Sequence, residues 1–474
     1  MERRWKVLAV VSVAVFVVGL DMFIVNIAFP KIERDFSGSS VSGISWVLSA
    51  YAIVLAALMV PAGRIADRIG RRRGFLTGLV VFTVGSALCG AAPSVLTLVL
   101  ARVIQAAGAA LLLPTALALL LPEFTPAERP MAIGIWSAVG GVAAAAGPPI
   151  GGLLVHVSWR LVFLVNLPVG VISFVYAVRL LRETRSDGEA RPDLLGGLLL
   201  MVAIGLLALG LVKAPDWGWG SAASLASLAG AGVGIALFWW RCLVHPSPVV
   251  DPAMLRVRSF AFASSASIAF NAAFAAMLLG NVLFLTGVWH YSVLHAGVAL
   301  MPGPAMAAAT AAPGGRLAGR FGQRTVAAAG ITLFAAGGAW WLWHLGATPS
   351  YANEMLPGQI MTGIGVGLTL PSLASAAAAS LPPARFATGS AVFTMTRQIG
   401  FALGVSILVA VLGSAHTTDA ISAFRGGWLF MVIAGLSGAA LASAMGPVRQ
   451  HASAAAAAPA QAQAQVALGQ SPAS

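Results

Sequence analysis

Fourteen apolar runs, each of about 18 or more residues, occupy most of this chain. An α-helix needs about 20 apolar residues to cross the roughly 30 Å hydrocarbon core of a bilayer, where it satisfies its own backbone hydrogen bonds. Only 9% of the 474 residues are charged, too few to cover a soluble globule. We therefore expect an all-α integral membrane protein with spans at about 7–29, 44–62, 74–92, 95–121, 131–155, 160–181, 194–213, 222–243, 260–286, 295–313, 325–346, 355–380, 388–413 and 427–446.

The basic residues are distributed unevenly among the segments that connect these runs. With the N-terminus placed in the cytoplasm, 21 of the 28 lysines and arginines fall on the cytoplasmic side and five on the other, while Arg102 and Arg397 lie inside runs. Because cytoplasmic loops are rich in Lys and Arg, this split predicts a multi-pass protein of the inner or plasma membrane with both termini cytoplasmic. It also accounts for the net charge of +13 without nucleic acid as a partner.

A basic segment occurs at matching places in two halves of the chain. Its first copy is Gly63–Arg73, and the second copy, 252 positions later, is Gly315–Arg324, with Gly319 where the first has Asp67. Further along each half, Arg102 aligns with Gln359 and Gly108 with Gly365. Internal repeats of this kind indicate two related bundles. We expect a six-helix bundle at 1–181, a linker with two inserted helices at 182–258, a second six-helix bundle at 259–448 and a disordered tail at 449–474.

Three ionisable side chains lie deep in the expected spans. Asp21 and Arg102 both lie roughly 12–14 Å below the outer surface, which permits an ion pair between them. Because ionisable groups in a membrane are costly, we interpret Asp21 as a proton carrier, with a structural, hydrogen-bonded acid as the alternative. Arg102 belongs either to a proton-dependent switch or to a static pair. Arg397 either meets substrate or binds backbone carbonyl groups.

The fifth span combines glycines with adjacent prolines. Close helix approach at Gly134, Gly147, Gly151 and Gly152, with the helix bent at Pro148, indicates either ordinary membrane packing or a hinge between the halves. Polar and aromatic side chains elsewhere are candidates for lining a substrate cavity, although each could instead face another helix or lipid. They are Asn26, Trp46, Tyr51, Trp136, Asn271, Asn281, Gln359 and Arg397.

No strong catalytic constellation is recognisable in the sequence. The seven histidines avoid the centres of the spans, and there is no Cys/His metal cluster, nucleotide-binding loop or nucleophile elbow. We therefore expect no enzyme activity, no cofactor and no metal, so that uphill transport would draw on an ion gradient. The expected partners are the bilayer, a small lipophilic substrate and protons. A monomer is the simplest unit, and an accessory protein stays an open question.

Several motifs resemble those of the major facilitator superfamily, in particular its fourteen-span drug:proton antiporter branch. The resemblance covers about 7–446. Three motifs depart from the pattern at single positions: Phe23, Ala106 and Ala143. The six motifs that carry the resemblance are Leu20–Pro30 in the first span, Gly63–Arg72 after the second, Arg102–Ala109 in the fourth, the glycine-proline segment of the fifth, Trp159–Pro168 and Asp216–Gly220.

The resemblance implies a major facilitator fold, in which two six-helix bundles, here with two inserted helices, rock about a central cavity. It assigns proton coupling to Asp21 and Arg102, and it makes Gly147 and Pro148 part of an element that favours antiport over leak. A conformational gate is implied for Gly63, Asp67, Arg68, Gly70, Arg71 and Arg72. We therefore expect proton-coupled efflux of drug-like or natural-product molecules, with a facilitator or importer of a specific metabolite as the alternative.

Overall fold

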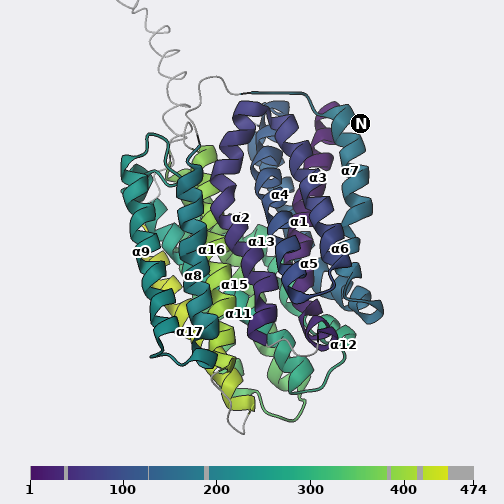
Figure 1. Cartoon of the computed structure of the whole chain (residues 1–474), viewed down its shortest axis with the longest axis vertical. Coiled ribbons are helices and arrows are strands. Elements are labelled where there is room, and N and C mark those ends of the chain that lie inside the picture. The colour runs from purple at the N-terminus through teal and green to yellow at the C-terminus, as the bar shows by residue number, and fades with distance from the viewer. Residues whose placement is uncertain are drawn as a thin grey trace, which may run out of the picture.

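The computed structural model is all-helical in the part of the chain that it describes, which comprises residues 2–36, 41–125, 128–185, 192–381, 386–413 and 420–446, without some side chains in three helices (Figure 1). The first half contains α1 (Arg3–Asp35), α2 (Val41–Ile69), α3 (Arg71–Ala91), α4 (Val95–Leu120), η1 (Leu121–Glu123), α5 (Arg129–Val157), α6 (Leu161–Leu164) and α7 (Asn166–Leu180). The middle contains α8 (Leu194–Trp217), α9 (Ala222–Val244) and α10 (Pro252–Leu255). The second half contains α11 (Arg258–Gly287), α12 (Val293–Ala299), α13 (Pro302–Phe321), α14 (Gln323–His344), η2 (Tyr351–Met355), α15 (Leu356–Ala379), α16 (Phe386–Gly413) and α17 (Ala420–Ser443).

Each of the fourteen expected spans has a helical counterpart. Within the described residues, thirteen helical segments are long and apolar enough to cross a membrane, and α5 supplies the remaining span. Two spans are divided by a short break, because α6 gives way to α7 near Val165 and α12 gives way to α13 before Pro302. Proline is well tolerated at the first position of a helix, where its missing N–H has no partner to lose. The chain is therefore a multi-pass membrane protein.

The two basic segments follow the expected spans 44–62 and 295–313, and their sequences predict loops between the spans. This prediction was wrong, because both segments are mostly helical. Helix α2 continues to Ile69 and α13 to Phe321, so that each basic segment forms the last turns of one helix and the first turn of the next. A single glycine separates the helices in each case, with φ of 119° at Gly70 and 87° at Gly322. Arginine favours helices and its long side chain reaches back to water, so the helix does not need to end where the apolar run ends.

A close crossing of two helices is repeated in both halves. A Cβ atom added to Gly78 in α3 would lie 3.0 Å from the carbonyl oxygen of Gly108 in α4. In the second half, a Cβ atom added to Gly330 in α14 would lie 3.0 Å from the carbonyl oxygen of Gly365 in α15. Small residues let helix backbones approach in a bilayer, where association depends on van der Waals packing rather than on hydrophobic burial. The repeat therefore preserves the backbone crossing itself.

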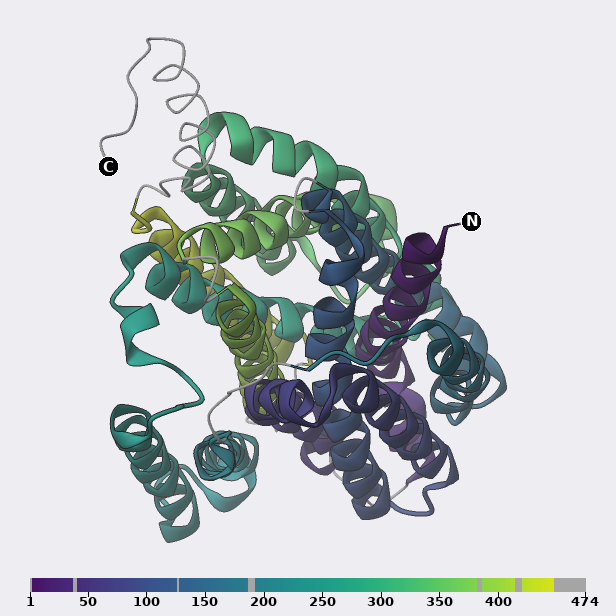
Figure 2. The same cartoon turned by 90° about the horizontal axis from the view of Figure 1, so that it is seen from above.

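The inserted pair α8 and α9 lies at the edge of the molecule, as the view along the helices shows (Figure 2). Helix α8 packs against α2 and α16, which come from different halves. At one contact, a Cβ atom added to Gly197 would lie 3.1 Å from the carbonyl oxygen of Ala57 in α2. The pair therefore covers the outside of the junction between the halves without entering it.

The two halves meet along α2 and α16, and also where α1 and α5 contact α11, α12 and α13. Phe23 of α1 packs edge-to-face on Phe274 of α11, with ring centroids 6.2 Å apart. A Cβ atom added to Gly297 of α12 would lie 2.7 Å from the carbonyl oxygen of Pro148 in α5. Helix α12 lies at the end of the bundle opposite the N-terminus (Figure 1).

Candidate functional site

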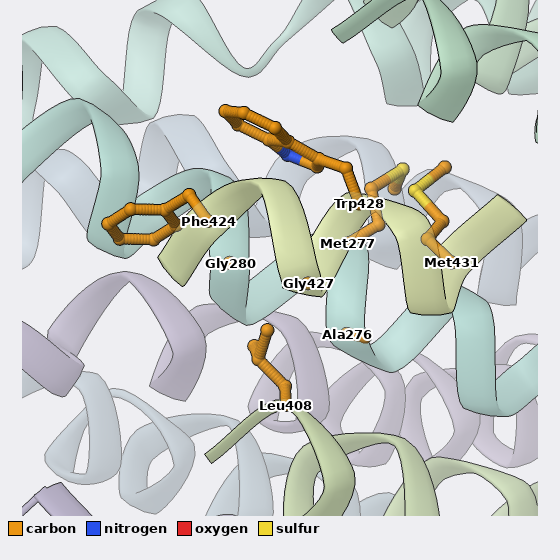
Figure 3. A pocket seen from close by; sticks show the side chains of 8 residues that line it. All are labelled: Ala276, Met277, Gly280, Leu408, Phe424, Gly427, Trp428 and Met431. Carbon is orange, nitrogen blue, oxygen red and sulfur yellow. The ribbon is translucent and has the colours of Figure 1, made fainter. Parts of the chain in front are cut away.

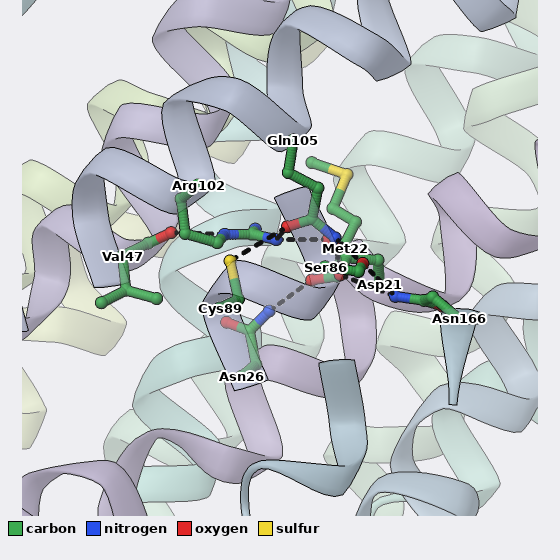
Figure 4. Close-up of polar contacts among 9 residues, drawn as sticks. All are labelled: Asp21, Met22, Asn26, Val47, Ser86, Cys89, Arg102, Gln105 and Asn166. Carbon is green, nitrogen blue, oxygen red and sulfur yellow. Dashed lines mark hydrogen bonds and ion pairs between the residues drawn. The ribbon is translucent and has the colours of Figure 1, made fainter. Parts of the chain in front are cut away.

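The two deep charges of the first half form an ion pair. Asp21 of α1 and Arg102 of α4 have exposed fractions of 0% and 1%, and the distance between Arg102 Nη1 and Asp21 Oδ2 is 2.5 Å (Figure 4). The two residues were expected at the same depth in their spans, which permitted this pair. A charge-assisted hydrogen bond of this kind is about twice as strong as a neutral one.

Three neutral polar side chains complete a network around the carboxylate. Gln105 Nε2 donates to Asp21 Oδ1 at 2.8 Å, and Asn166 Nδ2 reaches the same oxygen at 3.4 Å. Both amides also donate to Ser86 Oγ, at 2.6 Å and 3.0 Å. Because these residues come from α3, α4 and α7, the network ties α1 to three other helices (Figure 4). A buried network whose members all have partners holds its charges in one fixed geometry.

The guanidinium group of Arg102 has partners besides Asp21. Its Nε donates to the carbonyl oxygen of Val47 in α2 at 3.0 Å, and its Nη1 also donates to Gln105 Oε1 at 2.6 Å. The Tyr51 ring lies 3.9 Å from Arg102 Cζ, which is cation–π geometry. Arg102 is therefore held by α2 as well as by Asp21.

In this arrangement Asp21 is the carboxylate that faces Arg102, and its second oxygen accepts from Gln105. Proton binding to Asp21 removes the negative charge that attracts Arg102, whereas Gln105 can still donate to the remaining carbonyl oxygen. Removing one partner of a buried ion pair typically costs about 3–5 kcal/mol, because the other charge stays buried. The ion pair between Asp21 and Arg102 therefore ties α1 to α4.

The first basic segment is held together by an ion pair inside it. Arg71 Nε donates to Asp67 Oδ1 at 2.6 Å across the break at Gly70, while Arg68 is exposed. A Cβ atom added to Gly63 would lie 3.3 Å from Pro114 of α4, so this end of α2 packs tightly on α4. The segment therefore connects α2, α3 and α4 at one end of the bundle.

Glu183, which follows α7, binds the start of α3. Its two carboxylate oxygens accept hydrogen bonds from the backbone N–H groups of Arg72 and Arg73 at 3.0 Å and 3.3 Å. The backbone N–H of Arg71 donates to the carbonyl oxygen of Thr184 at 2.9 Å. A carboxylate at a helix N-terminus satisfies free N–H groups and complements the helix dipole. Glu183 thus links the end of the first half to the basic segment.

The start of α1 is anchored at the same end of the molecule. Arg3 pairs with Glu123 at 3.0 Å, and Arg4 pairs with Glu128 at 2.8 Å. Hydrogen bonds from Thr125 and from Arg4 lower the pKa of the Glu128 carboxyl below its usual range. Glu128 therefore keeps its negative charge at neutral pH.

The glycine-proline segment of α5 lies along α1. A Cβ atom added to Gly147 would lie 2.6 Å from Phe23 Cβ, and one added to Gly151 would lie 2.9 Å from Ile24 Cγ1. One added to Gly152 would lie 3.3 Å from Leu294 of the second half. The segment thus packs against both the helix that carries Asp21 and, near Pro148, the opposite half. Gly134 lies on α5, but its surroundings are outside the described residues.

Six of the eight cavity candidates have a buried polar atom without a hydrogen-bond partner in the described part of the chain: Asn26, Tyr51, Trp136, Asn281, Gln359 and Arg397. Asn271 instead donates to Ser267, and Trp46 is a partly buried member of the apolar core. Buried polar groups usually find partners, so such atoms mark places that water or a ligand can occupy. These six candidates therefore share a chemical property, although they lie on six different helices.

An apolar recess lies between α11, α16 and α17 (Figure 3). Its lining includes Met277, Leu408, Phe424, Trp428 and Met431, and it contains no charged side chain. Methionine and aromatic walls suit lipophilic groups. The recess offers packing but no polar chemistry.

The sequence matches the sequence model of the Major Facilitator Superfamily over residues 11–194 and 262–471. The chain belongs to the Major Facilitator Superfamily. The expected family and the expected fold are confirmed. The gap between the matched stretches contains α9 and nearly all of α8. Membership of this family indicates a transporter rather than an enzyme.

Characterised members of the superfamily include drug resistance proteins that resemble this chain along most of its length. It is 34% identical to the multidrug resistance protein Stp of Mycobacterium tuberculosis over 416 residues, which cover 87% of this chain and 77% of that protein. It is 33% identical to the tetracenomycin C resistance and export protein of Streptomyces glaucescens, with 87% and 76% covered. It is 35% identical to the puromycin resistance protein pur8 of Streptomyces alboniger, with 86% and 82% covered.

Solved transporter structures share the fold at low sequence identity. A peptide transporter POT crystallised with sulfate superposes with a TM-score of 0.68 at 16% identity, covering 94% of this chain and 96% of that chain. The nucleoside transporter NupG superposes with a TM-score of 0.66 at 13% identity, covering 94% and 100%. These likenesses concern the arrangement of the helices in this superfamily and not the substrate.

Four residues of the site were not among the sequence-based candidates. Gln105 and Asn166 lie inside motifs that resemble the family, so their positions were a usable signal. Ser86 is one serine in an apolar run and has no such signal. Glu183 lies in a charged linker, and its contact with α3 depends on how the chain returns to the end of α2.

Proposed function

We propose that this protein is an efflux permease that exchanges drug-like or natural-product molecules for protons by alternating access. The single observation that carries the proposal is the buried network of Asp21, Arg102 and Gln105, which contains the one carboxylate set deep in a span. Ionisable groups inside transporters commonly belong to proton or substrate pathways. The printed names of the relatives, which concern antibiotic resistance and export, support natural products as the substrate class.

The roles of the other residues follow from their contacts. Asp21 takes up and releases the proton, and Arg102 responds to the charge of Asp21. The basic segment Gly63–Arg72 gates one end of the bundle through Asp67 and Arg71. Gly147 and Pro148 in α5 couple the packing of α1 to the contact with α12 at the other end. We divide the chain at 181 and 258 into two rocking bundles and an inserted pair, with 449–474 as a tail.

The distribution of basic residues supports an orientation in the cell membrane. We assign both termini and the basic segments to the cytoplasm, because positive residues are retained on that side. The proton gradient is then the energy source and no cofactor takes part. Proton entry from outside neutralises Asp21, loosens its hold on Arg102 and allows α1 and α4 to repack as the bundles rock.

The decisive experiment measures substrate-triggered proton release from everted membrane vesicles that contain the wild type or Asp21→Asn. The panel comprises lipophilic cations, neutral compounds and anions. We expect proton release with several compounds in the wild type and none in Asp21→Asn. Glu33→Gln is the matched control, since Glu33 lies on the same helix outside the network and no ion pair of Glu33 occurs in the described residues.

The alternative functions give different results in the same assay. Transport by the wild type without proton movement would identify a facilitator. Proton movement with one metabolite alone, in the direction of uptake, would identify a specific importer. Persistent coupling in Asp21→Asn would make Asp21 a structural acid and contradict the assigned proton site.

A further inference from the structure

Arg397 of α16 is a second arginine within the spans, and its environment differs from that of Arg102. Its side chain is partly buried, and its Nε atom is buried without a hydrogen-bond partner in the described part of the chain. Arg397 forms no ion pair with any residue that the structure describes. A guanidinium Nε–H always carries a hydrogen, so this atom is a free donor.

The neighbours of Arg397 follow from the packing of α16 on α11. A Cβ atom added to Gly400 would lie 3.0 Å from Asn271 Cβ, and Gly404 packs on the backbone of Ala272. The two helices run in the same direction, so Arg397, one turn before Gly400, lies level with Ser264 and Ser267. Ser264 is 4% exposed, and its Oγ also has no hydrogen-bond partner in the described residues.

This part of the protein lacks an acid that could pair with Arg397. After Asp251, the sequence contains only the acids Glu354 and Asp419. Glu354 lies in η2, where it accepts a hydrogen bond from the backbone N–H of Gly346, and Asp419 lies outside the described residues. The deep carboxylate of the first half, Asp21, is held by Arg102. Among the described residues, Arg397 is thus a cation in the spans without a carboxylate paired with it.

We propose that Arg397 recognises an anionic group of the transported molecule, such as a carboxylate or an ionised phenol or enol. This inference rests on the proposed efflux function and names a substrate class for it. A guanidinium group binds carboxylates with two parallel hydrogen bonds in a fixed geometry, and it stays charged at every physiological pH. In the low-dielectric interior, the charge of the ligand supplies the pairing that the protein does not provide.

The test compares two ligands that differ at one functional group, which is charged in one and neutral in the other: a fluorescent aromatic carboxylate and its methyl ester. Binding to the detergent-purified protein is measured for the wild type, Arg397→Gln and Arg397→Lys. We expect the wild type to bind the carboxylate at least tenfold more tightly than the ester. Arg397→Gln should lose this preference with unchanged ester affinity, and Arg397→Lys should keep part of it. The use of a neutral detergent without added lipid excludes lipid phosphate as the anion that Arg397 binds.

Three results would overturn the inference. Equal affinity of the wild type for the acid and the ester would do so without any variant, even if Arg397→Gln failed to fold. An unchanged preference in Arg397→Gln would show that another group recognises the anion. If both Arg397→Gln and Arg397→Lys lost affinity for the acid and for the ester to the same extent, Arg397 would only support the packing of α16.

A transport assay in phosphatidylcholine vesicles then separates this inference from the proposed function. Proton-driven export of the ester without a preference for the carboxylate would leave the efflux proposal standing and remove the anion site. A preference for the carboxylate that depends on Arg397 but requires no protons would leave the anion site standing and contradict the proposed proton-coupled efflux.

Discussion

The two halves of the molecule share a backbone design and differ in their charges. Gly78 and Gly108 bring α3 and α4 into backbone contact, and Gly330 and Gly365 do the same for α14 and α15. In contrast, Gln359 stands in the second half where the first half has Arg102. The spans expected at 260–286 and 355–380, which match those of Asp21 and Arg102, contain no carboxylate. The comparison teaches that the glycine crossings are common to both halves, whereas among the described residues the deep ion pair between an acid and an arginine occurs in the first half alone.

The basic segments repeat this difference at the end of the bundle. The first is fixed by Asp67 and by Glu183, whereas in the second Gly319 replaces the acid. A Cβ atom added to Gly319 would have no atom within 4 Å, so this end of α13 is open. The first segment is therefore anchored by two carboxylates, whereas the described residues show no carboxylate bound to the second.

The largest expected effect comes from replacing Arg102 of the first half by glutamine, the residue that the second half has at the matching position. Arg102→Gln leaves Asp21 buried without its cation, so we expect a loss of stability of about 3–5 kcal/mol and loss of proton-coupled transport. The double variant with Asp21→Asn should recover most of the stability but none of the coupling. Thermal unfolding in detergent and vesicle proton release measure the two effects. Full stability of Arg102→Gln alone would contradict the importance of the ion pair.

A second substitution tests the shared feature and should affect both halves alike. Gly108→Ala and Gly365→Ala each place a Cβ atom within 3 Å of a facing backbone, at 2.8 Å from Gly78 O and 2.7 Å from Gly330 O. We expect each to lower the free energy of unfolding by about 1–3 kcal/mol, as overpacking does. Gly205→Ala in α8 is the control, because its Cβ would have no atom within 4 Å. Clearly unequal losses in the two halves would argue against equivalent crossings.

The smallest expected effect concerns the anchored segment. Glu183→Gln weakens the cap on α3, so we expect a loss of about 0.5–2 kcal/mol, confined to the start of that helix. Hydrogen exchange should quicken at the amides of Arg72 and Arg73 and stay unchanged at Arg324 in the second segment. Faster exchange at both segments would mean that the two ends open together and would remove the distinction.

Periodic and compositional features made most of the fold predictable. The apolar runs, the unequal distribution of arginines and the repeated segment gave the spans and the two-bundle organisation, because a bilayer admits few alternatives to helices of fixed length. Asp21 and Arg102 stood out because charges are rare at that depth. The helical nature of Gly63–Ile69 was missed, since the end of an apolar run marks the membrane surface and not the end of the helix.

The finer contacts of the site depend on tertiary structure. Ser86 joins the network only because α3 crosses α4 closely enough to bring its hydroxyl group to Gln105. Glu183 acts on a helix that lies far away in the sequence. Neither contact leaves a periodic trace, so a single sequence predicts the presence of polar groups in the spans but not which of them meet.

The unpaired arginine has an electrical consequence for the transport cycle. If the exported molecule carries one negative charge and one proton enters in exchange, each turnover moves two charges across the membrane in the same electrical sense. A potential of 100 mV, negative inside, contributes about 2.3 kcal/mol per charge, or about 4.6 kcal/mol per cycle. The membrane voltage alone could then sustain a gradient of roughly a thousandfold or more. An exporter that discharges anions through Arg397 would thus keep working when the external pH equals that of the cytoplasm.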